Sequence, residues 1–242
     1  MNDPGPRPTN ERILKAAAEL LAEGGLEAVS TRAVSARAGV QAPTLYRLFG
    51  DKQGMLDALA SYGFARFLVE KSAHHPIPDD VTSDGGDPLD VLRRGWDLHV
   101  DFGLAEPALY VLMYGAASYL GQRPPAAKEA YERLSVAIQK VAASGVLRVP
   151  VDVAAKMIHS AVIGVTLNLI TAPDGPQVSH LVREAVLAAI TASVGDRPGG
   201  RSADALATRA LALDAILADQ ADIFSEAETA LLRQWLRRLA DG

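Results

Sequence analysis

The chain has 242 residues, a length that suits one large domain or two smaller ones. It contains no cysteine, which excludes a disulfide scaffold, a zinc ribbon and a thiol nucleophile. The formal net charge of −5 argues against a bulk basic protein that coats nucleic acid, although a local basic patch is still compatible with it. Aromatic residues make up only 5% of the chain and alanine is abundant, so the composition favours an all-α fold over a β-sandwich or barrel.

The N-terminal residues 1–9 are polar and rich in proline, and we expect a flexible tail here rather than a signal peptide. The chain has no uninterrupted apolar run of about 18 residues, the length that a membrane-spanning helix needs. The best candidate, 161–170, is too short and contains Asn168. We therefore expect a cytoplasmic protein with no membrane partner.

Capping residues and glycine stops divide the first part of the chain into four predicted helices. Thr9 is the expected N-cap of the first helix, and Gly24 with Gly25 ends it. Ser30 is the expected N-cap of the second helix, and Gly39 supplies a tight turn before the third. The four predicted helices cover residues 10–23, 31–38, 42–49 and 52–71.

The composition changes between residues 73 and 87, where histidine, proline, aspartate and glycine replace the apolar residues. This segment predicts a loop that separates an N-terminal domain, 10–72, from a second domain, 87–242. Asp152 and the capping-box pattern at Ser225 mark two of the later helix starts. We find no strand pattern, and the later predicted helices cover residues 88–105, 107 onward, 125–145, 152–171, 178–194, 203–219 and 226–240.

Two short helices joined by a tight turn at Gly39 predict a helix-turn-helix, in which the second helix enters the major groove of DNA. Between residues 31 and 52, four basic residues stand against the single acidic residue Asp51, a local net charge of +3. An acidic protein thus carries a positive stretch where phosphates would lie. The four basic residues are Arg32, Arg37, Arg47 and Lys52.

The run from Gly25 to Leu56, about a quarter of the chain, resembles the DNA-binding domain of the tetracycline-repressor (TetR) family of bacterial regulators. The resemblance implies an all-helical homodimer with an N-terminal three-helix helix-turn-helix domain that binds double-stranded operator DNA. It also implies a C-terminal helical domain for dimerisation and effector binding. The most specific matches are Ala38-Gly39-Val40, Pro43-Thr44-Leu45-Tyr46, Phe49 and Lys52.

The resemblance implies a role for each matching position in the DNA-binding domain. Gln41, Ala42 and Thr44 fall where the family reads base edges or braces the DNA backbone from the recognition helix. Arg47 is expected to contact phosphate or guanine, and Arg32 is expected to face the other side of the groove. Read alone, Arg32 or Arg37 would be a solvated surface charge.

Tyr46 and Lys52 fall where the family places phosphate contacts. A lysine at the N-terminus of the fourth helix combines its own charge with the helix dipole, and both favour a phosphate. Tyr46 read by itself would also suit the hydrophobic core. Leu48 departs from the family, since many relatives carry histidine or another polar residue there, and we expect no side-chain phosphate contact at that position.

The helix over 88–105 is apolar on more than one face, which is typical of a helix in a core. In the family, the equivalent central helices wall an effector cavity, and aromatic residues with a few polar groups suit a small, mainly apolar effector. The alternative is that these residues are ordinary core. The candidate effector-binding residues are Trp96, His99, Phe102, Tyr110, Met113, Tyr114 and His159.

The predicted helices 152–171 and 178–194 carry stripes of small residues that permit close helix packing. In the family, two late helices from each subunit form a four-helix dimer interface, and these two helices match that pattern; an intrasubunit core is the alternative. The stripes are Ala161, Gly164 and Asn168 in the first helix, and Leu181, Ala185, Ala189 and Ala192 in the second.

Enzyme and metal functions find little support in the sequence. It has no phosphate loop, nucleophile elbow or His-Glu-x-x-His motif, and we predict no catalytic residues, no metal and no cofactor. His74-His75 with Asp79 and Asp80 are better explained as a polar loop than as a metal site. His99 and its neighbours Asp97 and Asp101 point to different helix faces because they are two residues apart.

We therefore predict a ligand-responsive transcriptional regulator that binds a pseudo-palindromic operator as a dimer. The family implies a repressor that an unidentified small molecule releases from DNA, with DNA and effector weakening each other's binding by the same factor. The alternative is a helix-turn-helix regulator without a small-molecule effector, whose C-terminal domain is filled by side chains and which a protein partner controls.

Overall fold

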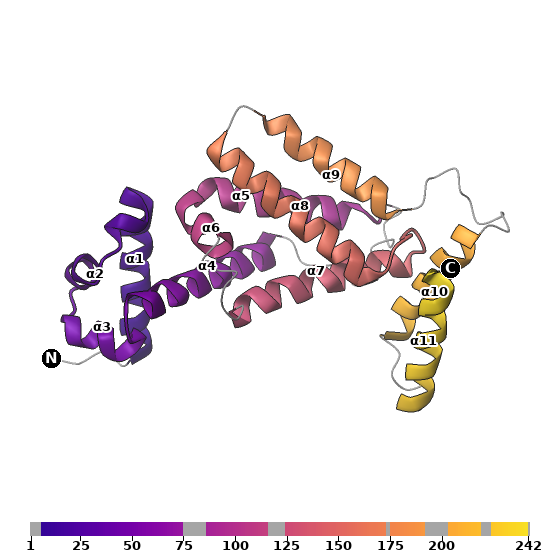
Figure 1. The fold of residues 1–242 in the computed structure, drawn as a ribbon, viewed down its shortest axis with the longest axis horizontal. Coiled ribbons are helices and arrows are strands. Elements are labelled where there is room, and N and C mark those ends of the chain that lie inside the picture. The colour runs from indigo at the N-terminus through magenta and orange to yellow at the C-terminus, as the bar shows by residue number, and fades with distance from the viewer. Residues whose placement is uncertain are drawn as a thin grey trace. The chain divides into compact units, whose positions relative to one another are not determined.

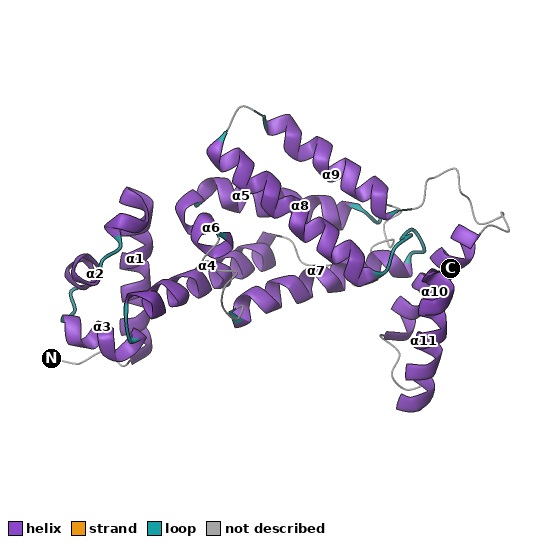
Figure 2. Cartoon of the chain, in the orientation of Figure 1, coloured by secondary structure: helices purple, strands orange, loops and turns teal. Residues whose placement is uncertain are grey.

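A computed structural model describes residues 6–74, 86–115, 124–172, 175–191, 203–218 and 224–241. Within these ranges the chain is helical throughout, apart from turns and an isolated bridge between Leu147 and Thr191 (Figures 1 and 2). The predicted all-α fold is confirmed. The helices are α1 (Pro6–Ala28), α2 (Thr31–Ala38), α3 (Ala42–Phe49), α4 (Lys52–His74), α5 (Asp90–Ala105), α6 (Pro107–Tyr114), α7 (Pro125–Ala143), α8 (Val151–Thr171), α9 (Pro176–Ile190), α10 (Ala203–Ala218) and α11 (Glu226–Asp241).

The chain divides into two compact units, each built from two stretches of sequence. The first unit combines Met1–Ala73 with Asp101–Ala130, and the second combines His74–Val100 with Tyr131–Gly242. The domain boundary predicted from composition falls mostly on residues 75–85, which lie outside the described residues.

Helix α1 begins earlier than the sequence predicted. It starts at Pro6, so Thr9 lies inside the helix and is not its N-cap. A proline in the first turn costs nothing, because the N–H that it lacks has no helical partner there. The predicted stop is confirmed: Gly24 and Gly25 have non-helical backbone angles, and Gly25 has a φ of 65°.

The first unit is organised around a core of apolar side chains from α1 to α4. α1 packs against α2, and α2 packs against α3. Burial of these residues supplies the main driving force for folding the unit. The most deeply buried side chains include Ile13, Leu21, Val34, Leu45 and Met55.

Helices α4 and α6 approach closely within the same unit. A Cβ atom at Gly63 would lie 2.7 Å from the Sδ of Met113, closer than van der Waals contact allows. At the next residue of α4, the ring of Phe64 meets the ring of Tyr114 edge-on, with a centroid distance of 5.2 Å. Glycine at position 63 therefore allows an aromatic contact to form beside it.

In the second unit, α8 packs against α9. α8 is long and apolar enough to cross a membrane by length and composition, but 44% of its apolar window is buried in the protein, as in a core helix. The predicted N-cap Asp152 is wrong: α8 follows Pro150, and Asp152 lies in its first turn, where it pairs with Lys156 at 3.2 Å.

Helix α9 ends four residues before the predicted position. Thr191 has extended backbone angles, and the N–H of Arg148 donates to the carbonyl of Ile190 at 2.9 Å. The loop before α8 therefore binds the last carbonyl of α9. The later residues 192–200, which include Ala192 of the predicted small-residue stripe, lie outside the described residues.

The tail helices α10 and α11 pack on each other through a small apolar core. The capping box predicted at the start of α11 is confirmed. The backbone N–H of Ser225 donates to Oε2 of Glu228 at 2.9 Å, and the N–H of Glu228 donates to Oγ of Ser225 at 3.4 Å.

Candidate nucleic-acid interface

The turn between α2 and α3 is built by short-range signals in the sequence. Ser30 caps α2, since its Oγ accepts a hydrogen bond from the N–H of Ala33 at 3.2 Å. Gly39 then adopts a left-handed conformation, with φ 63° and ψ 38°, that other residues rarely take. The N–H of Val40 donates to the carbonyl of Ser35 at 3.0 Å and closes the end of α2. Both helices have the predicted bounds, so the helix-turn-helix is present.

The start of α4 is fixed in the same local manner. Gly50 takes a φ of 79° at the end of α3, and Oδ1 of Asp51 accepts from the N–H of Gly54 at 2.8 Å. This cap sets Lys52 in the first turn of α4, where its charge adds to the field of the helix N-terminus.

The predicted DNA-contacting residues lie on α2, on α3 with its N-cap, and at the start of α4. Thr44 is partly buried, and the others are exposed to solvent. Tyr46 is 50% exposed, so its ring is not part of the core, and this removes the alternative interpretation of that residue. Leu45, its neighbour, is fully buried and anchors α3. The exposed residues are Arg32, Gln41, Ala42, Tyr46, Arg47 and Lys52.

One residue of the predicted positive stretch is not free to meet DNA. Both terminal nitrogens of Arg37 bond to the carboxylate of Glu23, at 2.9 and 2.8 Å, and Glu19 lies 3.5 Å away. The hydrogen bond from Arg37 lowers the pKa of Glu23, and Glu23 in turn raises the pKa of Arg37. Arg37 therefore fastens α2 to α1, and the positive charge counted at this position is neutralised.

Leu48, which departs from the family pattern, is partly buried on α3. An apolar side chain in this position has no group that can donate to a phosphate. Any phosphate contacts of this segment therefore come from its neighbours, of which Arg47 and Lys52 are exposed cations.

The candidate effector residues divide between the two units. Trp96, His99 and His159 belong to the second unit, and the other four belong to the first. The indole Nε1 of Trp96 donates to Oγ of Ser179 on α9 at 3.0 Å, and both Trp96 and His99 are buried. The ring of His159 meets that of Tyr131 edge-on, at 5.3 Å between centroids.

The four candidates of the first unit are buried among one another and against α4. Tyr110 and Tyr114 pack with a centroid distance of 4.7 Å, and Phe102 packs on Phe67 at 5.2 Å. Met113 lies against Gly63. Each of these side chains contributes to packing within its own unit.

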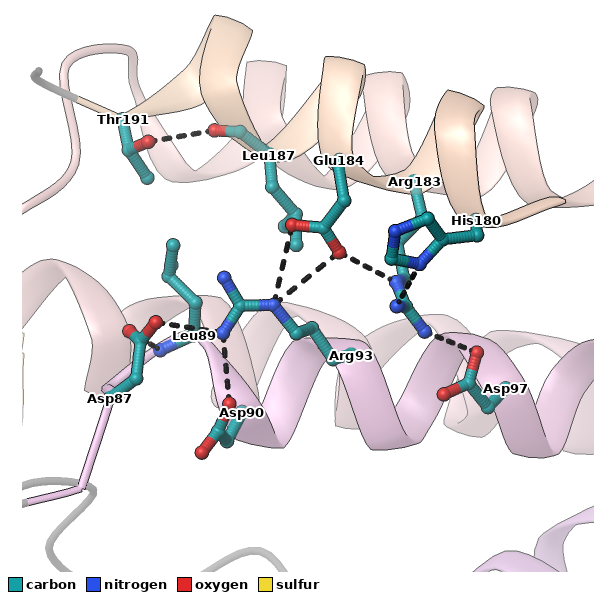
Figure 3. A network of polar contacts seen from close by, with 10 residues as sticks. All are labelled: Asp87, Leu89, Asp90, Arg93, Asp97, His180, Arg183, Glu184, Leu187 and Thr191. Atoms are coloured by element: carbon teal, nitrogen blue, oxygen red, sulfur yellow. Dashed lines mark hydrogen bonds and ion pairs between the residues drawn. The ribbon is translucent and has the colours of Figure 1, made fainter. Parts of the chain in front are cut away.

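A network of ion pairs joins α5 to α9, and the sequence analysis did not predict it (Figure 3). Arg93 on α5 bonds to Asp87 at 2.7 Å and to Asp90 at 2.8 Å, and lies 3.4 Å from Glu184 on α9. These carboxylates, Asp87 first, raise the pKa of Arg93. Asp90 and Arg93 lie three residues apart, so helical spacing was the available signal for part of the network.

The second half of the network centres on Arg183 of α9. Its guanidinium bonds to Asp97 of α5 and to Glu184 at 2.9 Å, and its Nη2 meets Nδ1 of His180 at 2.8 Å (Figure 3). Asp97, which the sequence analysis considered only as a neighbour of His99, thus binds the opposite helix. The network fastens α9 on α5, beside the bond between Trp96 and Ser179.

The small-residue stripes of α8 and α9 are largely open to solvent in the single chain. A Cβ atom at Gly164 would meet no atom within 4 Å, and Leu181 is 64% exposed. Asn168, Ala185 and Ala189 are also exposed. This exposure argues against the alternative that the stripes pack inside one subunit, and it leaves an apolar surface for a second copy.

No cluster of three metal-ligating side chains occurs among the residues that the structure describes. The polar segment considered as a metal site, His75 with Asp79 and Asp80, lies outside the described residues, as does the side chain of His74.

The fold and the exposed recognition helix define a helix-turn-helix protein of the DNA-binding class. Residues 13–59 match the family model described as bacterial regulatory proteins, tetR family. The uncharacterized HTH-type transcriptional regulator YvkB of Bacillus subtilis (strain 168) is 32% identical over 105 residues, which are 43% of this chain and 55% of YvkB. The tetracycline repressor protein class C of Escherichia coli is 39% identical over 70 residues, which are 29% of this chain and 31% of that protein.

Among solved structures, a TetR family transcription regulator from Marinobacter aquaeolei VT8 shares the fold with a TM-score of 0.57 and 18% identity, covering 77% of this chain and 97% of that one. The chain spans about half, or less, of the length of the two curated relatives. Residues 13–59 therefore resemble the DNA-binding domain of the tetR family, and the fold of the solved regulator extends over 77% of this chain.

Proposed function

We propose that this protein is a cytoplasmic, non-enzymatic transcriptional regulator that binds a pseudo-palindromic operator as a homodimer and that a small molecule releases from DNA. While it is bound to the operator, the proposed regulator represses transcription. The observation that carries the proposal is the recognition helix α3. Its buried Leu45 fixes the helix, while Gln41, Tyr46 and Arg47 are left exposed at and after its N-terminus.

The contacts divide by chemistry. Lys52 and Tyr46 present an ammonium and a hydroxyl group that bind phosphate oxygens and so position the protein on the duplex. Gln41, Thr44 and Arg47 present groups that can hydrogen-bond base edges in the major groove. Arg32, exposed at the start of α2, adds a further cation on the helix that precedes α3.

A dimer is required because one recognition helix reads a single half-site. The open stripes of α8 and α9 provide the surface, since small residues such as Gly164 let helices approach closely and Leu181 supplies apolar area. Two recognition helices related by a twofold axis then meet two half-sites one helical turn apart, about 34–36 Å.

The proposed effector is small and mainly apolar. Trp96 and His99 lie three residues apart on α5, are both buried, and supply apolar area together with a few polar atoms. Trp96 also contacts α9 through Ser179, and α9 carries part of the proposed dimer surface. A ligand that displaces this contact would shift α9 and so change the separation of the two recognition helices.

The packing of the other candidates favours a second function, regulation by a protein partner. Phe102, Tyr110, Met113 and Tyr114 are almost fully buried and fill their own unit with aromatic contacts. A C-terminal domain filled by its own side chains needs no small molecule, and a partner protein would then bind its surface.

The test of DNA binding is selection of bound sequences from a genomic fragment library with the purified protein. We expect a pseudo-palindrome with two half-sites, and the variant Arg47→Ala serves as the control that alters the recovered motif. Recovery of no enriched sequence at low salt would contradict the proposed function.

The test of effector control starts from a ligand found by thermal-shift screening. His99→Ala should bind the operator normally and no longer release it when the ligand is added. If the same variant melts at a lower temperature and binds DNA weakly with or without ligand, His99 is structural. Failure of a broad screen, together with capture of a partner that releases the operator, would favour the second function.

A further inference from the structure

The tail helices α10 and α11 leave a row of large apolar side chains exposed. On α11, Leu231, Trp235 and Leu239 are 45%, 52% and 45% exposed, and their four-residue spacing places them in one stripe. On α10 the exposed apolar residues are Leu206, Leu213 and Ile216.

The two stripes lie on the same side of the α10–α11 pair. The helices pack through Ala210, Leu217 and Leu236, and an ion pair between Asp214 and Arg233, 2.8 Å long, marks one edge of this contact. At 100° per residue, Trp235 lies on the other side of Leu236 from Arg233. On α10, Ala210 and Leu217 face α11, with Asp214 on one side of them and the exposed leucines on the other. Both stripes therefore line the edge of the helix pair opposite the ion pair.

The contact of α10 with α7 lies on the other side of α10 and leaves this edge exposed. Nε2 of Gln139 on α7 donates to the carbonyl of Ala215 on α10 at 3.3 Å. Ala215 lies beyond Asp214 on the helical wheel, on the side away from Leu206 and Leu213. We name the opposite edge, with its six exposed apolar side chains, the tail face: Leu206, Leu213, Ile216, Leu231, Trp235 and Leu239.

Charge on the tail face is arranged with opposite signs at its two ends. Glu228 lies in line with Leu231, one turn before it, and Arg238 lies beside Leu239. Hydrogen bonds from the hydroxyl and backbone N–H of Ser225 lower the pKa of Glu228, so the carboxylate stays ionised. Two parallel copies would set like charges together, whereas two antiparallel copies bring the end of α11 that carries Glu228 beside the end of the partner helix that carries Arg238.

We propose that the tail face binds the tail face of a second copy of this chain, with the two α11 helices antiparallel about a twofold axis at Trp235. Such an interface is isologous. Leu231 then meets Leu239 of the partner subunit, and Trp235 meets its own equivalent. The stripe is symmetric about Trp235, so one register satisfies all three apolar contacts. This contact is separate from the surface proposed on α8 and α9.

The absence of cysteine from the chain makes a direct test simple. In the full-length protein, Trp235→Cys should form a disulfide-linked dimer under mild oxidation, because the two thiols face each other across the axis. Arg237→Cys is the matched control. It is exposed on the same helix but points away from the tail face, and it should stay unlinked. Equal linking by both variants, or by neither, would overturn the proposal.

Direction and register are tested by mixing two variants. Leu231→Cys and Leu239→Cys should each link poorly alone and link well when mixed, because residue 231 of one copy faces residue 239 of the other. Efficient linking of Leu231→Cys alone would indicate parallel helices and overturn the antiparallel arrangement. Adding Gly164→Glu on α8 should leave the links intact if the tail contact is independent.

A measurement without cysteines covers the case in which the thiol variants misfold. The chain has two tryptophans, so Trp96→Phe leaves Trp235 as the only one. Its emission should move to shorter wavelength as the protein concentration rises, and Leu231→Glu should abolish the shift. A spectrum that stays constant with concentration, or that shifts only on addition of anionic lipid vesicles, would show that a second copy does not cover this face.

Discussion

Arg37 on α2 clasps the carboxylate of Glu23 on α1 through two hydrogen bonds, 2.9 and 2.8 Å long. Fourteen residues separate the partners, and Glu23 is the last residue before the Gly24-Gly25 break. A bidentate pair of this kind fixes orientation as well as distance. It therefore orients α2 on α1, and it neutralises one cation of the stretch that we predict to face DNA.

The first prediction compares the salt dependence of DNA binding in two variants. Lys52→Ala should weaken all operators alike and flatten the slope of log affinity against log salt concentration by about one, because one phosphate contact is lost. Arg37→Ala should leave the slope unchanged and lower the melting temperature slightly. Salt titrations of operator binding check both, and an equal change of slope in the two variants would place Arg37 on DNA.

The second prediction concerns base reading by Arg47. If its guanidinium makes a bidentate contact with guanine, Arg47→Ala should lose roughly 1–3 kcal/mol of discrimination at that base pair. Site selection with the variant should then give a motif that is relaxed at one position of each half-site. The same motif recovered with uniformly lower affinity would assign Arg47 to phosphate.

The helix-turn-helix could be predicted closely from sequence because its boundaries are set by local interactions. Ser30 caps α2 three residues away, and Gly39 and Gly50 take positive φ values that few other residues adopt. Each signal acts within about one turn of helix, so it is visible in a short stretch of sequence. The start of α1 was missed because a proline in the first turn makes an earlier start equally favourable.

The contacts that determine which charges are free could not be predicted in the same way. Arg93 and Glu184 are 91 residues apart, and Arg183 and Asp97 are 86 apart. Helical spacing shows that such residues share a face, but not which helix packs against that face. The structure supplies this information, and it shows that Arg37, counted in the predicted positive stretch, is paired with Glu23 of α1.

The third prediction concerns the dimer surface that we propose on α8. In a chain whose tail face is also blocked by Leu231→Glu, Gly164→Glu should yield monomers, because a charge buried without a partner in an apolar interface is strongly destabilising. A monomer contacts a single half-site and should lose most of its operator affinity. Since Gly164 is open to solvent in the single chain, the subunit itself should tolerate the side chain.

Light scattering measures the mass of the Gly164→Glu protein, and circular dichroism shows whether the monomer is folded. Lys156→Glu is a suitable control, because it adds negative charge to an exposed position of the same helix. A double variant, Gly164→Glu with Leu231→Glu, that remains dimeric would move the interface away from α8.

The fourth prediction concerns stability in acid and the network between α5 and α9. Burial raises the pKa values of Asp87 and Glu184, but hydrogen bonds and charge from arginines outweigh it and hold both values below the ordinary 3.8 and 4.5. Below these ordinary values the unfolded chain binds more protons than the folded one. The stabilisation is therefore complete above about pH 5 and is lost as the pH falls through the lowered values.

Arg93→Ala should remove much of this effect. The free energy of unfolding near pH 7 should fall by on the order of 1 kcal/mol, because the partners are partly exposed and exposed ion pairs contribute little each. The loss should shrink below pH 4, where the carboxylates of the wild type also become protonated. Lys156→Ala, which breaks a more exposed pair, is the control and should change stability less. Urea unfolding between pH 3 and pH 7 measures the difference, and a loss that is equal at both ends of this range would show that Arg93 stabilises α5 by packing rather than by charge.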